Sequence, residues 1–361
     1  MLPMLDLTDR KRCFYWQTDR NLSSEDYVRI FLKRHDVPKG ELINILRYGI
    51  TSIPNIKEIE IQDPDENVTR GNVNIVRKVR INDRSNVVRM HPKEVKNGYF
   101  YVEKVAHDLA IQAGLPVATI LEVHEAKSVD DMDFVLMSVL PGVTLDNYLL
   151  EDKTNEEELL CKAGTLMAQI HTIKVEGLGP FDNEIAKTKQ KLVGLHANYH
   201  DFIWSGLEEN LQRLISLGVI NQVQAHNMHS VFEKTNYEPL YGPRLIHNDM
   251  ADWNLLTDGK EITGILDWDE CHGGDPIADL ACWSTFFDMP RYENFLKGYM
   301  SISTLPEDYE KRFHFYRLRY TISKMALRVK RYSVDRSEHV RSRIESGKVA
   351  LREEMQWITN S

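Results

Sequence analysis

One stretch in the second half of the chain constrains the fold more than any other. From Leu245 to Trp283 it reads LIHNDMADWNLLTDGKEITGILDWDECHGGDPIADLACW. Two short apolar segments in it flank the turn-forming residues Thr-Asp-Gly-Lys at 257–260, which predicts a β-hairpin. A hairpin would bring Asn254, just before the first strand, next to Asp267, just after the second. The chain must therefore fold so that polar side chains gather at the open end of this hairpin.

The polar residues around the hairpin follow the pattern H-x-D-x-x-x-x-N, with a further acid after the second strand. They are His247, Asp249, Asn254 and Asp267. Phosphoryl transfer needs a carboxylate that orients an attacking hydroxyl and accepts its proton, and hard oxygen ligands for Mg²⁺. An aspartate, an asparagine and a second aspartate in this arrangement suit both tasks. The alternative interpretation of an isolated pattern of this kind is a polar turn beside a core strand.

Length and composition describe an ordinary globular protein. With 361 residues the chain exceeds the usual size of about 100 to 200 residues per domain, so two lobes are expected. Hydrophobic residues make up 42% and charged residues 27%, which excludes disordered and fibrous classes. The net charge of −9 argues against a nucleic-acid partner and favours cationic ligands.

The expected location is the cytoplasm, with no membrane partner. No run of 18 apolar residues occurs that could cross a bilayer. The four cysteines are far apart and form no CxxC pair, so we expect reduced thiols.

The first part of the chain is predicted to form a helix and then short strands. An N-cap serine and well-placed charges predict a helix over 24–35. Strands are expected over 41–48, 72–81 and 85–90, with a hairpin turn between the last two, and residues 54–70 are expected to form an inserted surface loop.

Helices are expected to dominate from there on. Apolar spacing predicts a helix over 99–113, which ends at a glycine, and strands follow over 120–123 and 134–139. Further helical patterns cover 156–173 and 201–217. The segment 324–352 is rich in arginine and lysine, and we expect it to be a solvated helix face.

The 245–283 stretch resembles the catalytic loop and metal-binding acid of the aminoglycoside phosphotransferase family and its choline-kinase-like relatives. Gly274-Asp275-Pro276 and Asp279-Leu280-Ala281 match the usual continuation of that pattern. The resemblance covers most of the chain. It implies an α+β, protein-kinase-like fold of two lobes: a small antiparallel-sheet lobe for the nucleotide over 1–140, and a larger α-rich lobe for catalysis and substrate over 141–361.

The resemblance also implies a role for each residue of the pattern. Asp249 would be the catalytic base, and Asn254 and Asp267 would hold Mg²⁺. Three further residues would be structural, namely His247, Asp275 and Asp279. His171 is interpreted as a packing residue.

In the first lobe, the resemblance implies a phosphate-binding turn that includes Gly71 and Asn74. This turn lacks the second glycine of a typical glycine-rich loop. Arg89 stands where a protein kinase has its phosphate-holding lysine, and Glu103 is its expected ion-pair partner. Alternatives to Arg89 are Lys93, Lys96 or no functional role, as an exposed arginine at a strand edge.

Residues 134–142 resemble the hinge between the lobes. The backbone of Ser138 and Leu140 would pair with a purine edge, and Met137 would line its pocket. The implied cofactors are ATP and Mg²⁺, with GTP as an alternative nucleotide.

The acceptor is expected to be a hydroxylated small molecule. The stretch Gly177–Phe181 resembles hygromycin-type members of the family, which implies an aminoglycoside or related antibiotic as substrate and a role in antibiotic resistance. Asp269 and Glu270 would then hold a cationic amine, with Glu208 and Glu209 as an alternative acidic patch.

Two alternative hypotheses remain. One is a housekeeping kinase that acts on choline, an amino sugar or a similar metabolite, and the other is a non-catalytic binding protein. The second is disfavoured because Asp249, Asn254 and Asp267 are all present.

Overall fold

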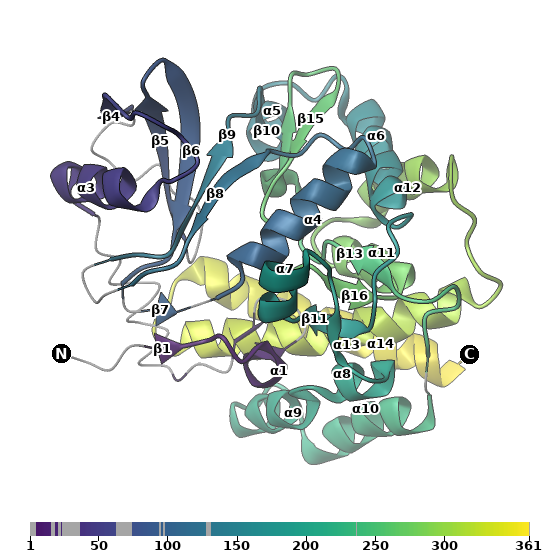
Figure 1. Cartoon of the computed structure of the whole chain (residues 1–361). Coiled ribbons are helices and arrows are strands. Elements are labelled where there is room, and N and C mark those ends of the chain that lie inside the picture. Colours follow the sequence, from purple (N-terminus) through teal and green to yellow (C-terminus); the bar gives the residue numbers. More distant parts are fainter. Residues whose placement is uncertain are drawn as a thin grey trace.

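The computed structural model describes residues 5–15, 19–20, 23, 37–62, 74–93, 95–96, 98–127, 131–235 and 237–360. Over these residues the protein has an α+β fold. An antiparallel sheet lies at one side of a larger, mostly helical region (Figure 1). The helix predicted over 24–35 and residues 63–70 of the loop predicted over 54–70 lie outside the described residues.

The sheet has five strands in the order β4-β5-β6-β9-β8, all antiparallel. Their bounds are β4 Ile59–Ile61, β5 Ile75–Ile81, β6 Arg84–Met90, β8 Ile120–His124 and β9 Phe134–Ser138. In β5 the buried residues alternate with more exposed ones, as expected for a strand with one face on a core. The predicted hairpin between β5 and β6 is present, and it turns at Asn82–Asp83.

Two predictions for this region were wrong. Residues 41–48 form part of helix α3 (Lys39–Gly49), not a strand. Its buried residues Leu42, Ile45, Leu46 and Gly49 recur at helical spacing, and they pack against the apolar face of the sheet. The β-branched isoleucines suggested a strand, but burial against the sheet favours the helix. Within the predicted loop 54–70, residues 59–61 form the edge strand β4.

Helix α4 (Phe100–Gln112) follows the first three strands of the sheet in sequence and matches the prediction. It ends at Gly114, whose φ of +78° suits a residue without a side chain. The buried side chains Val102, Val105 and Ala106 belong to the main apolar core of the helical region. Helix α4 therefore anchors the sheet to that region.

Helices make up most of the chain after residue 144. They are α5 Leu145–Glu151, α6 Glu156–Ile170, α7 Asn183–Lys189, α8 Tyr199–Trp204, α9 Leu207–Ser216, α10 Gln222–Lys234, α11 Pro276–Ser284, α12 Met289–Met300, α13 Tyr309–Tyr332 and α14 Glu338–Asn360. Helices α6 and α12 pack closely because each has a glycine at the crossing. A Cβ on Gly164 would lie 1.8 Å from the carbonyl oxygen of Phe295, and one on Gly298 would lie 1.7 Å from that of Cys161.

Two further predictions need correction here. The segment predicted as one helix over 201–217 forms two helices, α8 and α9. The chain breaks between them because Gly206, the N-cap of α9, adopts a left-handed backbone with φ +68°. The basic segment 324–352 is not one solvated helix face. It spans the end of α13 and most of α14, which pack together, and both Lys324 and Lys330 are buried.

Two small sheets connect the helices near the hairpin. One has the order β10-β14-β15, from Val143–Thr144, Leu255–Thr257 and Ile262–Ile265. The other has the order β12-β11-β16-β13, from Gly194–His196, Leu178–Phe181, His272–Gly274 and Arg244–Ile246. Strand β10 pairs directly with β14. The chain that leaves the five-stranded sheet is thereby attached to the hairpin.

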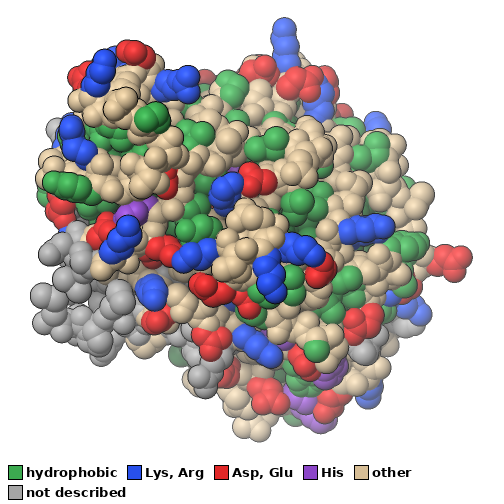
Figure 2. Space-filling model, viewed as in Figure 1, with side chains coloured by type: hydrophobic (Ala, Val, Ile, Leu, Met, Phe, Trp, Pro, Cys, Tyr) green, Lys and Arg blue, Asp and Glu red, His purple; other side chains and the backbone are tan. Residues whose placement is uncertain are grey.

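The described N-terminal residues form short elements only: β1 Leu5–Asp6, α1 Arg10–Cys13, β2 Phe14–Tyr15 and β3 Asp19–Arg20, with β1 parallel to β7 Val95–Lys96. On the face shown in Figure 2, basic and acidic side chains intermingle and hydrophobic ones are scattered. None of the helices in the described ranges combines the length and apolar character that a bilayer crossing requires. Cys161, Cys271 and Cys282 are free thiols.

Candidate active site

The predicted hairpin is present and brings its two polar ends together. Strands β14 and β15 pair antiparallel, with Leu255 opposite Ile265. Beyond this pair, the backbone N–H of Leu266 donates to the carbonyl of Asn254 at 2.8 Å. Asn254 closes a short 3₁₀ turn, η2 (Asp252–Asn254), and Asp267 follows Leu266. The pairing therefore places Asn254 and Asp267 side by side, as the sequence predicted.

The side chain of Asn254 is attached to Asp249. Its amide nitrogen donates to the carbonyl of Asp249 at 2.8 Å and to the carboxylate of the same residue at 2.9 Å. Both protons of the amide are used in this way, so the amide oxygen is left to accept or to bind a cation. One residue thus orients the candidate base and offers a hard ligand beside it.

Asp267 is half-exposed and has an unusual backbone. Its φ is +60°, a left-handed conformation that costs a non-glycine residue about 1 kcal/mol or more. The carboxylate accepts a hydrogen bond from Arg89 at 2.7 Å. Arg89 also forms the predicted ion pair with the buried Glu103. One guanidinium therefore joins strand β6, helix α4 and the hairpin, a connection to Asp267 that the sequence did not predict.

His247 braces both arms of the site. Its Nε2 is 3.0 Å from the carbonyl oxygen of Leu266, and its Nδ1 accepts the backbone N–H of Asp249 at 3.3 Å. Burial lowers the pKa of His247 to about 4. The neutral ring then donates from Nε2 and accepts at Nδ1, so it fixes the spacing between the segment with Asp249 and the segment with Asp267.

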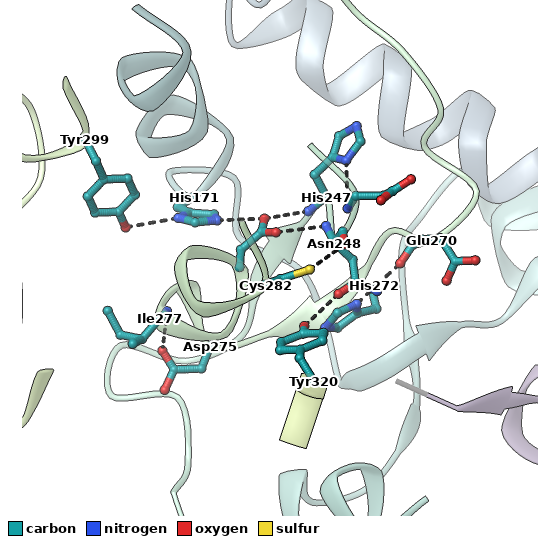
Figure 3. Close-up of polar contacts among 12 residues, drawn as sticks. His171, His247, Asn248, Glu270, His272, Asp275, Ile277, Cys282, Tyr299 and Tyr320 are labelled. Carbon is teal, nitrogen blue, oxygen red and sulfur yellow. Dashed lines mark hydrogen bonds and ion pairs between the residues drawn. The ribbon is translucent and has the colours of Figure 1, made fainter. Parts of the chain in front are cut away.

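Behind residues 247–254, the catalytic loop, lies a chain of buried hydrogen bonds (Figure 3). The carboxylate of Asp279 on α11 accepts the backbone N–H groups of His247 at 2.9 Å and of Asn248 at 3.0 Å. It also lies 3.2 Å from Nε2 of His171, whose Nδ1 is 3.0 Å from the hydroxyl of Tyr299. Burial tends to raise the pKa of Asp279, but these partners outweigh burial and lower it.

Asn248 is held from a second direction, by helix α13. The hydroxyl of Tyr320 donates to its side-chain oxygen at 2.6 Å, and the thiol of Cys282 lies 3.0 Å from its carbonyl oxygen (Figure 3). Asn248 has φ +70°, also in the left-handed region. Its neighbours thus stabilise the backbone turn that directly precedes Asp249.

Asp275, the N-cap of α11, is likewise enclosed. Its carboxylate accepts the backbone N–H of Ile277 at 3.0 Å, the guanidinium of Arg312 at 2.7 Å and the hydroxyl of Tyr316 at 2.9 Å. Asp275 is buried. This geometry ties the start of α11 to α13.

The front of the loop concentrates negative charge. Desolvation and the carboxylates of Asp267 and Glu270 raise the pKa of Asp249 well above its usual value. Desolvation and the charge of Asp269 raise the pKa of Asp267 to about 7, against the opposing charge of Arg89. A site with these properties favours a bound cation.

The oxygens of Asn254 and Asp267 fit a magnesium ion. Among the described residues no group of three or more histidine, cysteine, aspartate or glutamate side chains is arranged for a metal. Mg²⁺ commonly takes only one or two protein oxygens and completes its shell with phosphates and water. The pair of oxygens here suits that mode of binding.

The remaining predicted nucleotide residues lie along the sheet and the chain that leaves it. Met137 and Ser138 are half-buried in β9, and the Ser138 backbone N–H donates to the carbonyl of Thr119 at 3.0 Å. Leu140 lies against Gly264 of the hairpin. Asn74 is buried beside β5, and Gly71 lies outside the described residues.

The acidic pair expected to contact the substrate is enclosed. Asp269 is 6% exposed and Glu270 is 3% exposed, and both have further polar partners. Their charges raise the pKa of Asp249, so they lie near the catalytic loop. They offer little surface to a ligand in this structure.

Sequence reasoning missed Lys324, which it assigned to a solvated helix face. Lys324 is buried on α13, and its charge acts on Asp249. No local pattern in the sequence distinguishes it: its place follows from Tyr320, one helical turn earlier on α13, which donates to Asn248.

Comparison with known proteins gives the family. Residues 67–313 match the sequence family described as "Phosphotransferase enzyme family". The chain belongs to this family. The match includes the five-stranded sheet from β5 onward, the catalytic loop and the hairpin, and it ends within the first turns of α13.

Solved structures of other phosphotransferases share the fold. A ternary complex of aminoglycoside phosphotransferase APH(4)-Ia with AMP-PNP and hygromycin B superposes with a TM-score of 0.61, at 18% identity, over 87% of this chain and 99% of that chain. A candidate fructosamine-3-kinase from Thermobifida fusca superposes with a TM-score of 0.55, at 17% identity, over 86% of this chain and 98% of that chain.

A mouse protein is similar in sequence as well. Acyl-CoA dehydrogenase family member 10 is 22% identical over 240 residues, which are 61% of this chain. The matched region is only 20% of that protein's length. The similarity therefore concerns a part of that longer protein.

Proposed function

We propose that this phosphotransferase moves the γ-phosphoryl group of ATP onto a hydroxyl group of a small molecule. The observation that carries the proposal is the attachment of Asn254 to Asp249, with Asp267 beside it. A candidate base and two candidate metal-binding oxygens thus lie together at the open end of one hairpin. This is the set of groups that such a transfer requires.

In the proposed reaction, the acceptor oxygen forms a bond to the γ-phosphorus as the bond from that phosphorus to the β–γ bridging oxygen breaks. ADP leaves, and the acceptor proton passes to the Asp249 carboxylate. The raised pKa of Asp249 makes its ionised form a stronger base than an ordinary aspartate. Asn254 orients that carboxylate through its amide hydrogen bond.

The nucleotide would lie between the sheet and the hairpin. Arg89, aligned by Glu103, would hold phosphate oxygens. The backbone of Ser138 and Leu140 would pair with the purine, with Met137 lining its pocket; GTP is the alternative nucleotide. Asn254 and Asp267 would hold Mg²⁺, which when bound neutralises charge on the phosphates.

The acceptor expected from the sequence is an aminoglycoside or related antibiotic, and the APH(4)-Ia complex of the same fold holds hygromycin B. The alternative is a metabolite kinase without a resistance role. The burial of Asp269 and Glu270 argues against an aminoglycoside whose amine is held by these two carboxylates.

Calorimetry with ATP, in the presence and absence of Mg²⁺, tests the nucleotide half of this proposal. We expect binding that depends on Mg²⁺ in the wild type and is lost in Asp267→Asn. Asp258→Asn is the matched control, because Asp258 is exposed at the far turn of the same hairpin.

A phosphate-transfer screen over hydroxylated compounds, with ATP and with GTP, tests the other half. If ATP binds equally well without Mg²⁺, or if Asp267→Asn keeps full transfer, the proposal is wrong.

A further inference from the structure

Three basic side chains gather where α13 and α14 pack together. We call Lys324, Arg328 and Arg343 the cationic cluster. Nη1 of Arg328 lies 3.2 Å from the carbonyl oxygen of Arg343. Burial lowers the pKa of Lys324 to about 7 and that of Arg328 to about 10, and the charge of Arg343 acts in the same direction on both. Lys324 and Arg328 are one helical turn apart on α13, and Arg328 contacts the backbone of Arg343, so the three basic residues are neighbours.

No carboxylate forms an ion pair with the cationic cluster in the part of the chain that the structure describes. Other basic residues on α13 are paired. Arg312 contacts Asp275 at 2.7 Å, and Arg317 contacts Glu354 at 2.5 Å. Within the described residues, Arg328 and Arg343 thus differ from Arg312 and Arg317 in having no ion-pair partner, in a protein whose net charge is −9.

The cationic cluster begins beside the catalytic loop. Tyr320 on α13 donates to Asn248, the residue before Asp249. Lys324 is one helical turn further along, and its ammonium donates to the hydroxyl of Thr285. The charges of Lys324 and Asp249 act on each other. Arg328 follows after one more turn, so the positive charge extends away from the candidate base along the helix.

An aromatic surface lies between the loop and the cluster. The ammonium of Lys324 is 3.3 Å from the ring centre of Phe286, and the ring of Trp253 is 5.2 Å from that of Phe286. Trp253 directly precedes Asn254 and is 38% exposed, so part of its ring is open to a ligand. An apolar part of a ligand could cover this ring.

We propose that the acceptor carries an anionic group, a carboxylate or a phosphate, which binds Arg328 and Arg343 while its hydroxyl reaches Asp249. Its apolar part lies on Trp253. This inference rests on the proposed function and names the class of its substrate. An arginine pair suits both anions, because guanidinium groups donate two parallel hydrogen bonds to carboxylate or phosphate oxygens.

Matched acceptors test the charge requirement. The panel contains hydroxycarboxylic acids of graded chain length, each beside its primary amide; hydroxyalkyl monophosphates of graded chain length, each beside the corresponding diol; and hygromycin B. We expect the anionic member of a pair to be phosphorylated with kcat/KM at least about 10-fold above its neutral counterpart, since a hydrogen bond to a charged group contributes about 1.5 to 3 kcal/mol. Comparison of the carboxylic-acid pairs with the phosphate pairs shows whether the site prefers a carboxylate or a phosphate.

Single substitutions then locate the site. Arg328→Gln and Arg343→Gln should each raise KM for the preferred anion by about 10- to 100-fold and leave KM for its neutral counterpart unaltered. Arg341→Gln on α14 is the matched control, because Arg341 is exposed and lies 3.8 Å from Glu338. Equal effects of Arg341→Gln and Arg343→Gln would overturn the assignment.

A measurement without turnover covers the case in which no panel compound is phosphorylated. Acetate and inorganic phosphate should each be tried as the probe, and at least one should raise the melting temperature of the wild type but not of the Arg328→Gln/Arg343→Gln variant.

Absence of a shift with both anions overturns the inference. Turnover of hygromycin B in preference to every anion would also overturn it and yet support the proposed function. Loss of Mg²⁺-dependent ATP binding would instead refute the proposed function itself.

Discussion

The two sides of the catalytic loop are built in opposite ways. Behind it, the carboxylate of Asp279 accepts two backbone N–H groups and contacts His171, and these partners lower its pKa. In front of it, the carboxylates of Asp249 and Asp267 repel each other, and their pKa values are raised. Asp279 is 1% exposed, whereas the Asp267 side chain is 40% exposed.

This difference separates stability from function. A buried carboxylate with all its partners stabilises the fold, and removing it leaves buried donors without acceptors. Carboxylates that repel one another destabilise the fold, and such groups persist where a ligand needs them. We therefore expect substitutions behind the loop to change the free energy of unfolding, and substitutions in front of it to change activity.

The largest expected effect lies in front of the loop. Asp249→Asn keeps the shape of the side chain but cannot accept the acceptor proton. Since positioned proton transfer contributes about 10²- to 10⁴-fold, kcat should fall by that order. ATP affinity, measured by calorimetry with Mg²⁺, should stay within a few-fold. Normal turnover, or loss of nucleotide binding as severe as in Asp267→Asn, would contradict the role given to Asp249.

The next effect lies behind the loop. Asp279→Asn places an amide that cannot accept both backbone N–H groups, so at least one buried donor loses its acceptor. We expect the free energy of unfolding to fall by about 1 to 3 kcal/mol, measured by urea denaturation. Asp83→Asn, in the exposed turn between β5 and β6, is the control and should change little. An unchanged denaturation midpoint in Asp279→Asn would remove the contrast between the two sides.

Acidification should change stability in opposite directions through the buried histidines and through the carboxylates in front of the catalytic loop. Burial lowers the pKa of His107, His247 and His272 to about 4. Below about pH 6.5 the unfolded chain binds protons that these buried rings do not. Stability should therefore be full above that pH and fall toward pH 4, by about 1 kcal/mol per pH unit for each histidine.

Asp267 acts in the other direction, because its pKa of about 7 lets the folded state bind a proton first. Urea midpoints over this pH range should consequently fall more steeply in Asp267→Asn than in the wild type. A midpoint that rises on acidification would show that the front carboxylates outweigh the histidines.

The smallest effect concerns the backbone of Asp267. Asp267→Gly and Asp267→Ala both remove the carboxylate, but only glycine adopts φ +60° without a steric cost. The glycine variant should be more stable by about 1 kcal/mol, measured by denaturation in parallel. Both variants should be equally inactive, and equal stability would show that the left-handed backbone relaxes when the carboxylate is removed.

Local signals allowed much of this site to be predicted from sequence. The turn residues 257–260 and the apolar segments beside them predicted the hairpin, and its geometry then followed for Asn254 and Asp267. The prediction of a strand over 41–48 was wrong. The isoleucines of this segment favour a strand locally, but their burial against the sheet favours a helix.

Contacts between distant segments could not be predicted. Arg89 and Asp267 are 178 residues apart in the sequence, and no local pattern indicates their contact. Lys324 looked like one more base on a charged helix, and only the packing of α13 against the loop distinguishes it.

The regular geometry of α13 has a consequence for the size of the acceptor. Tyr320, which touches the residue before Asp249, and Arg328 are eight positions apart on one continuous helix. At 1.5 Å per residue their backbones are separated by about 12 Å along the helix axis. A molecule that spans this interval must be elongated, with its reactive hydroxyl and its anionic end on the order of ten ångströms apart. If Arg328 and Arg343 bind the anion of the acceptor as proposed, the length of this helical segment selects chain length among otherwise similar hydroxylated anions.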